Sequence, residues 1–180
     1  MEEVLLRISP DESLYIINLT AREAETILAL TKDGAQTDFE ASVSCIGASI
    51  CQVGARDSQA LLKACIERIR KEHFPNDVLP KIHISGCPSS CSGHPVAALG
   101  FRGGVKQTPE GPKPAFAVYE MGCPIEGEES FGKELGVMLE SDIPEFLAEL
   151  GRELMARDLI YSDFIQKYHE DFLKIANRFL

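Results

Sequence analysis

Four of the six cysteines in this 180-residue chain fall into two close pairs. The first pair is Cys45-x5-Cys51. The second, Cys87-x3-Cys91, lies in the run Ile-Ser-Gly-Cys-Pro-Ser-Ser-Cys-Ser-Gly-His that ends at His94. Thiolates are soft, charged donors, and four of them supply one ligand for each iron of a cubane iron–sulfur cluster. The two pairs therefore predict a metal or cluster site.

Other uses of these cysteines stay open. Paired zinc ligands in a chain typically have about two to four residues between them, so the wider gap between Cys45 and Cys51 does not favour a structural zinc site. Without a signal peptide, disulfides are disfavoured, and plain buried thiols are the remaining alternative. Cys65 lies on the apolar face of a predicted helix and is expected in the core, whereas Cys123 is expected as a free thiol.

The elements around the cysteine pairs are predicted from their residue patterns. Residues 81–85 favour a strand that breaks at Gly-Cys-Pro into a turn, which can aim two sulfurs and several N–H groups at one point. A helix is expected to start at Asp57, and strands over 96–103 and 115–121 are expected to form a hairpin. Three prolines and a glycine in 108–114 favour a loop there.

The remaining segments complete the predicted fold. The glycine-rich segment 122–136 is expected to be irregular, and two helices follow it, the second with an apolar stripe over 164–179. Strands over 3–8 and 13–19, then a helix opened by a capping box at Thr20, predict a small β–β–α unit at the N-terminus. The fold class is therefore α/β, loosely α+β, with a mixed sheet flanked by helices.

Composition narrows the function. Lys and Arg number 18 against 28 Asp and Glu, and the net charge of −10 argues against non-specific binding of nucleic acid, which requires a cationic surface. The sequence has no apolar run of membrane-spanning length and no basic N-terminus leading into an apolar stretch. These features predict a cytoplasmic protein that does not enter a membrane.

The motifs carry a family resemblance. Cys-x5-Cys, followed by His-Ile-Ser-Gly-Cys-Pro-x-x-Cys and then by Leu-Gly-Phe-Arg-Gly-Gly at 99–104, resembles the sirohaem-dependent nitrite and sulfite reductases. The resemblance covers almost the whole chain. It implies a ferredoxin-like half-domain at 1–38 and a nitrite/sulfite reductase domain that binds a 4Fe–4S cluster and sirohaem at 39–180. The chain would then be either a domain of a longer protein or a small stand-alone relative.

The resemblance also implies the ligands and the reaction. Cys45, Cys51, Cys87 and Cys91 would hold the 4Fe–4S cluster, and Cys91 would also bridge to the iron of sirohaem. Ferredoxin or another low-potential donor would supply electrons for the six-electron reduction of nitrite or sulfite. An isolated chain is expected to show little or no turnover, because the cationic residues that hold the substrate in this family come largely from a second half or a partner subunit.

Three residues outside the cysteines are candidates for cofactor binding. Ser89 stands where the family usually has Asn, and its hydroxyl can still donate a hydrogen bond towards a cluster sulfur. His94 either lies near the cofactor or is exposed on a turn. Arg102 follows Phe101 in a predicted strand, so the two side chains should face opposite ways. No residue of this chain is assigned a catalytic role.

One alternative belongs to another functional class, in which the chain binds the cluster but catalyses no reaction. The chain would then be a non-catalytic iron–sulfur module that transfers electrons or senses redox state, with no sirohaem. Uptake of sirohaem separates the two functions. In both cases the cysteine turns should be looser without cofactor, because metal binding is part of what folds such a site.

Overall fold

The computed structural model describes residues 3–9 and 12–180, and the chain divides into two compact units, Met1–Gln36 (unit 1) and Thr37–Leu180 (unit 2). Unit 1 contains an antiparallel hairpin and one helix: β1 (Leu5–Ile8), β2 (Leu14–Ile17) and α1 (Ala21–Leu30). The predicted capping box is present, since Glu23 N–H donates to the Thr20 hydroxyl and the Glu23 carboxylate accepts from Thr20 N–H.

Unit 2 is built on a five-stranded mixed sheet. Its strands lie side by side in chain order: β3 (Val43–Ser44), β4 (Ile82–Ser85), β5 (Leu99–Thr108), β6 (Gly111–Glu120) and β7 (Lys133–Leu139). The first three strands are parallel, and the last three are antiparallel. The predicted fold class, a mixed sheet with helices and a small N-terminal unit, is confirmed.

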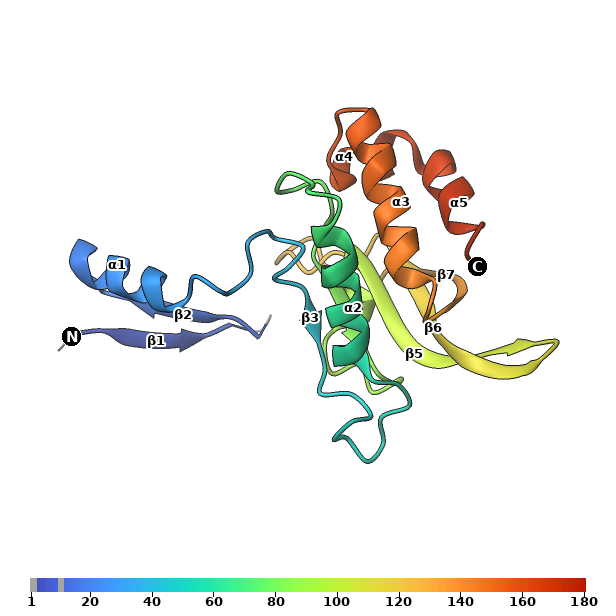
Figure 1. Cartoon of the computed structure of the whole chain (residues 1–180), viewed down its shortest axis with the longest axis horizontal. Helices are drawn as coiled ribbons and strands as arrows, with labels where there is room; N and C mark the ends of the chain where they lie inside the picture. Colours follow the sequence, from blue (N-terminus) through green and yellow to red (C-terminus); the bar gives the residue numbers. More distant parts are fainter. Residues whose placement is uncertain (1–2, 10–11) are drawn as a thin grey trace. The chain divides into compact units, whose positions relative to one another are not determined.

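Helices gather on one side of this sheet (Figure 1). They are α2 (Ser58–Arg70), α3 (Ile143–Ala156), α4 (Tyr161–Lys167) and α5 (His169–Ala176), and a short 3-10 turn, η1 (His94–Val96), precedes β5. Alternate residues of the strands, such as Ile84, Phe101 and Val118, are fully buried against the helices in one core, and Cys65 lies in the same core as predicted. None of the described helices is long and apolar enough to span a bilayer.

The loop predicted at 108–114 is too long, because only Pro109 and Glu110 form the turn between β5 and β6. Pro112 and Pro114 belong to β6, opposite Gln107 and Val105 of β5. Residues two apart in a strand present their N–H positions to the same edge. Both prolines lie beyond Ala115, the first β6 residue that pairs with β7, at an edge where no described strand needs the missing donors.

Three further boundaries differ from the prediction. The segment 122–136 is not irregular throughout, because β7 starts at Lys133. The pairing of β7 with β6 has a bulge between Val118, which lies opposite Gly136, and Tyr119, which lies opposite Glu134. The strand expected at 96–103 starts later and extends to Thr108. The final helix is two helices, since Tyr168 has a non-helical backbone (φ −134°, ψ 38°).

Candidate functional site

The two cysteine loops leave the same edge of the sheet. Cys45 directly follows β3, and Gly86 and Cys87 directly follow β4. These strands pair in parallel, with Val43 opposite His83, so their carboxyl ends lie together. The backbone N–H of Cys45 also donates to the Ile84 carbonyl at 3.1 Å, which extends the pairing to the cysteine itself.

Backbone contacts hold the first loop against the second. The carbonyl of Gly86 accepts from the N–H groups of Ala55 (3.1 Å) and Arg56 (2.9 Å), and Gly86 N–H donates to Cys45 Sγ at 3.1 Å. A Cβ at Gly86 would lie 2.5 Å from the Arg56 carbonyl oxygen, and one at Gly103 of β5 would lie 2.2 Å from the Gly86 oxygen. Two glycines therefore allow this close approach.

The paired cysteines lie in polar surroundings near the surface. Cys45 Sγ lies 3.2 Å from the hydroxyl of buried Ser58, and hydrogen bonds from the side chain and backbone of Ser89 lower the pKa of Cys87. By contrast, burial alone raises the pKa of Cys65 strongly. A lowered thiol pKa favours the thiolate that binds metal. The structure thus separates a core thiol from thiols that accept hydrogen bonds.

The sulfur atoms of the four paired cysteines do not form one group of metal ligands in the described residues. Cys45 and Cys51 are half-buried, Cys87 is buried and Cys91 is exposed, and all six cysteines are free. Across residues 3–9 and 12–180, no three His, Cys, Asp or Glu side chains are grouped so that they could hold a metal ion. The donor chemistry and the adjacent loops fit an iron–sulfur cluster, and the loops must close further for four thiolates to share one.

His94 is buried (2% exposed), and the structure therefore contradicts the alternative that placed it on an exposed turn. Its Nδ1 lies 3.2 Å from the hydroxyl of Ser90 in the second cysteine loop, and its ring packs against Tyr119 at a centroid distance of 5.0 Å. Burial, with a smaller effect from the nearby charge of Arg102, lowers the pKa of His94 to about 4. The imidazole is therefore neutral at physiological pH.

Arg102 faces away from Phe101, as predicted, and belongs to a polar cluster on the sheet face opposite the core. Its Nε donates to the Tyr119 hydroxyl at 2.9 Å, and its guanidinium forms an ion pair with Glu134 at 3.1 Å. The Tyr119 hydroxyl donates to the same carboxylate oxygen at 2.5 Å. These hydrogen bonds, that from Tyr119 first, lower the pKa of Glu134. Arg102 and Glu134 therefore form an ion pair that has no net charge.

Sequence reasoning missed Ser58, Tyr119 and Glu134 as neighbours of the candidate site. Ser58 is visible only as part of a helix start, and Glu134 lies in the segment expected to be irregular. Tyr119 carried one usable signal, because it lies in the predicted strand that pairs with the strand of Arg102. Sequence patterns also gave no sign that His169 pairs with buried Glu120.

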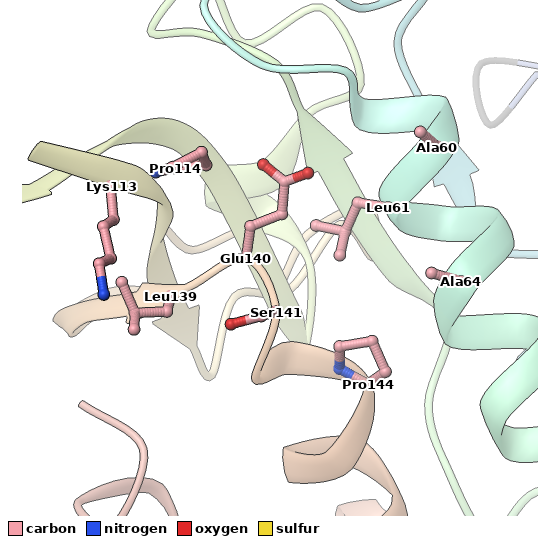
Figure 2. Close-up of a pocket in the computed structure, with 9 residues that line it drawn as sticks. All are labelled: Ala60, Leu61, Ala64, Lys113, Pro114, Leu139, Glu140, Ser141 and Pro144. Carbon is pink, nitrogen blue, oxygen red and sulfur yellow. The ribbon is translucent and has the colours of Figure 1, made fainter.

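A separate hollow of about 430 Å³ lies between α2, the start of α3 and the β6–β7 edge (Figure 2). The Glu140 carboxylate lies between Pro114 and Leu61 in this view. Burial raises the pKa of Glu140. The lining residues are Ala60, Leu61, Ala64, Lys113, Pro114, Leu139, Glu140, Ser141 and Pro144. No cysteine lines this hollow, so it is distinct from the cysteine loops.

Sequence comparison finds partial relatives. A sulfite reductase (NADPH) hemoprotein beta-component of Lysinibacillus sphaericus (strain C3-41) is 29% identical over 107 residues, covering 54% of this chain and 19% of that protein. The protein of the same name from Nitrobacter hamburgensis (strain DSM 10229 / NCIMB 13809 / X14) is 28% identical over 109 residues. The chain therefore spans about a fifth of the length of the curated relatives it matches. It matches no protein-family model.

Comparison with solved structures finds proteins of the same kind as the sequence comparison. The Mycobacterium tuberculosis NirA protein matches with a TM-score of 0.72 at 17% identity, over 93% of this chain and 33% of that one. Dissimilatory sulfite reductase I (DsrI) matches with a TM-score of 0.53 at 11% identity, over 90% of this chain and 61% of that one. The chain therefore shares its fold with parts of these two proteins. The predicted resemblance to the sirohaem nitrite and sulfite reductase family is confirmed for one domain-sized part of the family's proteins.

Proposed function

We propose that this chain is the cluster-bearing part of a sirohaem nitrite or sulfite reductase. In this proposal Cys45, Cys51, Cys87 and Cys91 would hold a 4Fe–4S cluster, and Cys91 would be the cysteine that this cluster shares with sirohaem. The observation that carries it is the meeting of two cysteine loops at the carboxyl ends of adjacent parallel strands, with Gly86 N–H directed at Cys45 Sγ. The sulfite reductase hemoprotein relatives support the choice of cofactor.

When bound, the cluster and sirohaem would supply the one-electron steps that add up to a six-electron reduction of the oxyanion. The residues of this chain would tune that centre. Hydrogen bonds to Cys45 from Gly86 N–H and to Cys87 from Ser89 stabilise negative charge on sulfur, and such bonds help to set a cluster's reduction potential. Ser89 therefore keeps the polar role proposed for it despite its short side chain.

We place His94 and Arg102 beside the cofactor. His94 is tied to the second cysteine loop through Ser90, and Arg102 is held in place by Tyr119 and Glu134. A neutral imidazole and a fixed guanidinium can both donate hydrogen bonds to the carboxylates of a sirohaem edge. Their role would be to orient the macrocycle.

The substrate site would need more than this chain. Arg102 already forms an ion pair, and no catalytic residue is assigned here. A second half or a partner subunit would supply the cationic groups that bind nitrite or sulfite, and ferredoxin or another low-potential donor would supply electrons. We assign residues 1–38 to a ferredoxin-like half-domain and residues 39–180 to the domain that binds the cluster and sirohaem.

Anaerobic reconstitution with iron, sulfide and sirohaem tests this proposal. The expected product contains about four irons per chain and shows a haem spectrum perturbed by the cluster. Cys51→Ser should reduce iron binding, whereas Cys123→Ser is a matched control outside the two loops and should leave it unchanged. Cys91→Ser should abolish the perturbation of the haem spectrum. Zinc binding in place of iron, or equal iron uptake by all the variants, would contradict the assignment.

One observation favours the second candidate, an electron-transfer or redox-sensing module that holds the cluster alone. The ion pair of Arg102 with Glu134 has no net charge that would attract an anionic macrocycle. Four irons per chain with no uptake of sirohaem, repeated with Glu134→Gln to release the guanidinium, would support this module. Uptake of sirohaem by the unaltered chain would exclude it.

A further inference from the structure

Two buried hydroxyl groups close the base of the second cysteine loop. Ser85 is the last residue of β4 and stands shortly before Cys87, whereas Ser92 directly follows Cys91. The two side-chain oxygens lie 2.7 Å apart, so one hydroxyl donates a hydrogen bond to the other. The exposed fractions of the two serines are 1% and 6%. This hydrogen bond therefore joins the two ends of the segment that carries both cysteines.

His83 makes a second contact with the same end of the loop. Its Nδ1 lies 2.7 Å from the backbone carbonyl oxygen of Ser92. A carbonyl oxygen only accepts, so Nδ1 carries the hydrogen and donates it. Because side chains alternate along a strand, His83 and Ser85 leave β4 on the face opposite to that of core residue Ile84. Two side chains of that face thus hold Ser92, one through its hydroxyl and the other through its backbone.

The backbone of β5 leaves room for the chain that returns after Cys91. Gly100 of β5 lies opposite His83 in the sheet. A Cβ at Gly100 would lie 2.1 Å from the backbone carbonyl oxygen of His94. The glycine therefore lets the chain beyond Ser92 lie against this face of the sheet, within reach of the side chains of β4.

The loop itself has a conformation that benefits from such contacts. Ser90 has a φ of 60°, which is disfavoured for a residue with a side chain, and Gly93 has a φ of 67°. Turn hydrogen bonds run from the Ser90 N–H to the Cys87 carbonyl (3.4 Å) and from the Gly93 N–H to the Ser90 carbonyl (2.9 Å). Cys91 is exposed and stands between strained Ser90 and the buried serine that β4 holds. The contacts of that serine therefore determine where Cys91 lies.

We propose that His83, Ser85 and Ser92, together called the loop clamp, are positioning residues that hold Cys87 and Cys91 ready to bind the cofactor. This inference rests on the proposed function, which makes the two cysteines ligands, and adds residues that are not ligands themselves. A preorganised pair of ligands loses less conformational entropy on binding than a mobile pair. Loss of the clamp should therefore weaken iron retention although every cysteine remains.

A double variant separates positioning from general stability. Ser85→Ala or Ser92→Ala leaves the other hydroxyl buried without its partner, so each should lower the urea concentration at which half the chain is unfolded. The double variant has neither hydroxyl and should recover most of that stability. After anaerobic loading with iron and sulfide, however, it should release iron to a ferrous chelator about tenfold faster than the unaltered chain, because the loop ends are no longer joined. A purely structural role would change stability and iron release together.

Two further comparisons make the test specific. Ser49→Ala is the matched control, because it removes a serine hydroxyl that lies between the cysteines of the first loop and donates only to the nearby Ile46 carbonyl among its described contacts. It should leave iron release unchanged. His83→Leu removes the donor to Ser92 and should speed iron release, whereas His83→Asn keeps an N–H donor in a similar place and should restore slow release.

Hydrogen exchange at the Gly93 N–H reports on the loop without iron. In the cofactor-free double variant this exchange should be about tenfold faster than in the unaltered chain. Unchanged exchange, iron release as slow as that of the unaltered chain, or a loss of stability that parallels the loss of iron would each overturn the loop clamp alone. An unaltered chain that binds no iron would refute the proposed function, and the positioning role with it.

Discussion

The backbone N–H of Gly86 donates a hydrogen bond to Sγ of Cys45 at 3.1 Å, and this contact joins the two cysteine loops. A sulfur that accepts a backbone hydrogen bond is stabilised as a thiolate. The same glycine accepts hydrogen bonds at its carbonyl from the end of the first loop, at Ala55 and Arg56. One residue therefore contacts the first loop at both of its ends.

Replacement of Gly86 should disrupt this junction. A Cβ there would lie 2.5 Å from a backbone oxygen that cannot rotate away, so Gly86→Ala should destabilise unit 2 by about 1–3 kcal/mol and reduce iron uptake. Gly104→Ala is the control, because a Cβ at Gly104 meets no atom within 4 Å. Urea unfolding and iron analysis of both variants check the prediction, and equal behaviour would contradict it.

His94 should make stability depend on pH. The pKa of the imidazole is about 6.5 in the unfolded chain. In the folded chain, burial lowers it to about 4, and the charged groups nearby are Arg102, Glu134 and His83. The unfolded state therefore binds more protons between these values, and stability is lost as the pH falls from 6.5 towards 4. We expect a loss of roughly 2 kcal/mol, allowing for partial solvent screening.

Urea unfolding at pH 7 and pH 4.5 measures this effect. The unaltered chain should lose more stability over that range than His94→Gln does, because the carboxylates that also titrate are common to both proteins. An equal loss in the two proteins would show that His94 is not held neutral.

The Tyr119 hydroxyl organises Arg102 and Glu134, and its removal should cost stability. Tyr119→Phe deletes one hydrogen bond to each partner and leaves their ion pair, so the expected loss is about 0.5–1.5 kcal/mol at pH 7. The pKa of Glu134 should also rise, because the hydrogen bond from Tyr119 is the largest cause of its lowered value. Chemical denaturation and NMR titration of Glu134 test the two parts, and an unchanged pKa would refute the second.

The pair formed by Glu120 and His169 should be strongly coupled. Glu120 is 1% exposed, and both of its carboxylate oxygens lie 3.0 Å from Nε2 of His169. Because His169→Ala leaves a buried carboxyl group without this hydrogen-bond partner, we expect a loss of about 1–3 kcal/mol. The double variant Glu120→Gln, His169→Ala should lose less than the sum of the single variants. Additive losses in this double-mutant cycle would mean that the pair is not coupled.

Sequence patterns predicted an element correctly where a local signal, such as a helix cap or a helical period, determined its structure. The capping box at Thr20, the helix that follows Asp57 and the first of the two predicted C-terminal helices are all present, because capping and helical periodicity are local properties. The fold class followed from the order of such elements.

The failures have non-local causes. Pro112 and Pro114 lie in a strand because no described strand pairs with the edge where their N–H groups are missing. That edge is free only because β7 begins to pair with β6 at Ala115. The two-residue strand β3 exists only through its pairing with β4. Likewise, the partnership of Glu120 with His169 and that of Tyr119 with Glu134 join residues whose spacing in sequence carries no signal.

The parallel pairing of β3 with β4 also imposes an order of events. Two neighbouring parallel strands cannot be joined by a tight turn, and here the chain crosses over through α2 between them. The two cysteine pairs therefore meet only after the crossover has packed, and long-range contacts of this kind form slowly. A nascent chain presents each pair separately, so under the proposed function a cluster held by both pairs would be loaded after unit 2 has folded. The rate of iron uptake during refolding would then report when the native topology has formed.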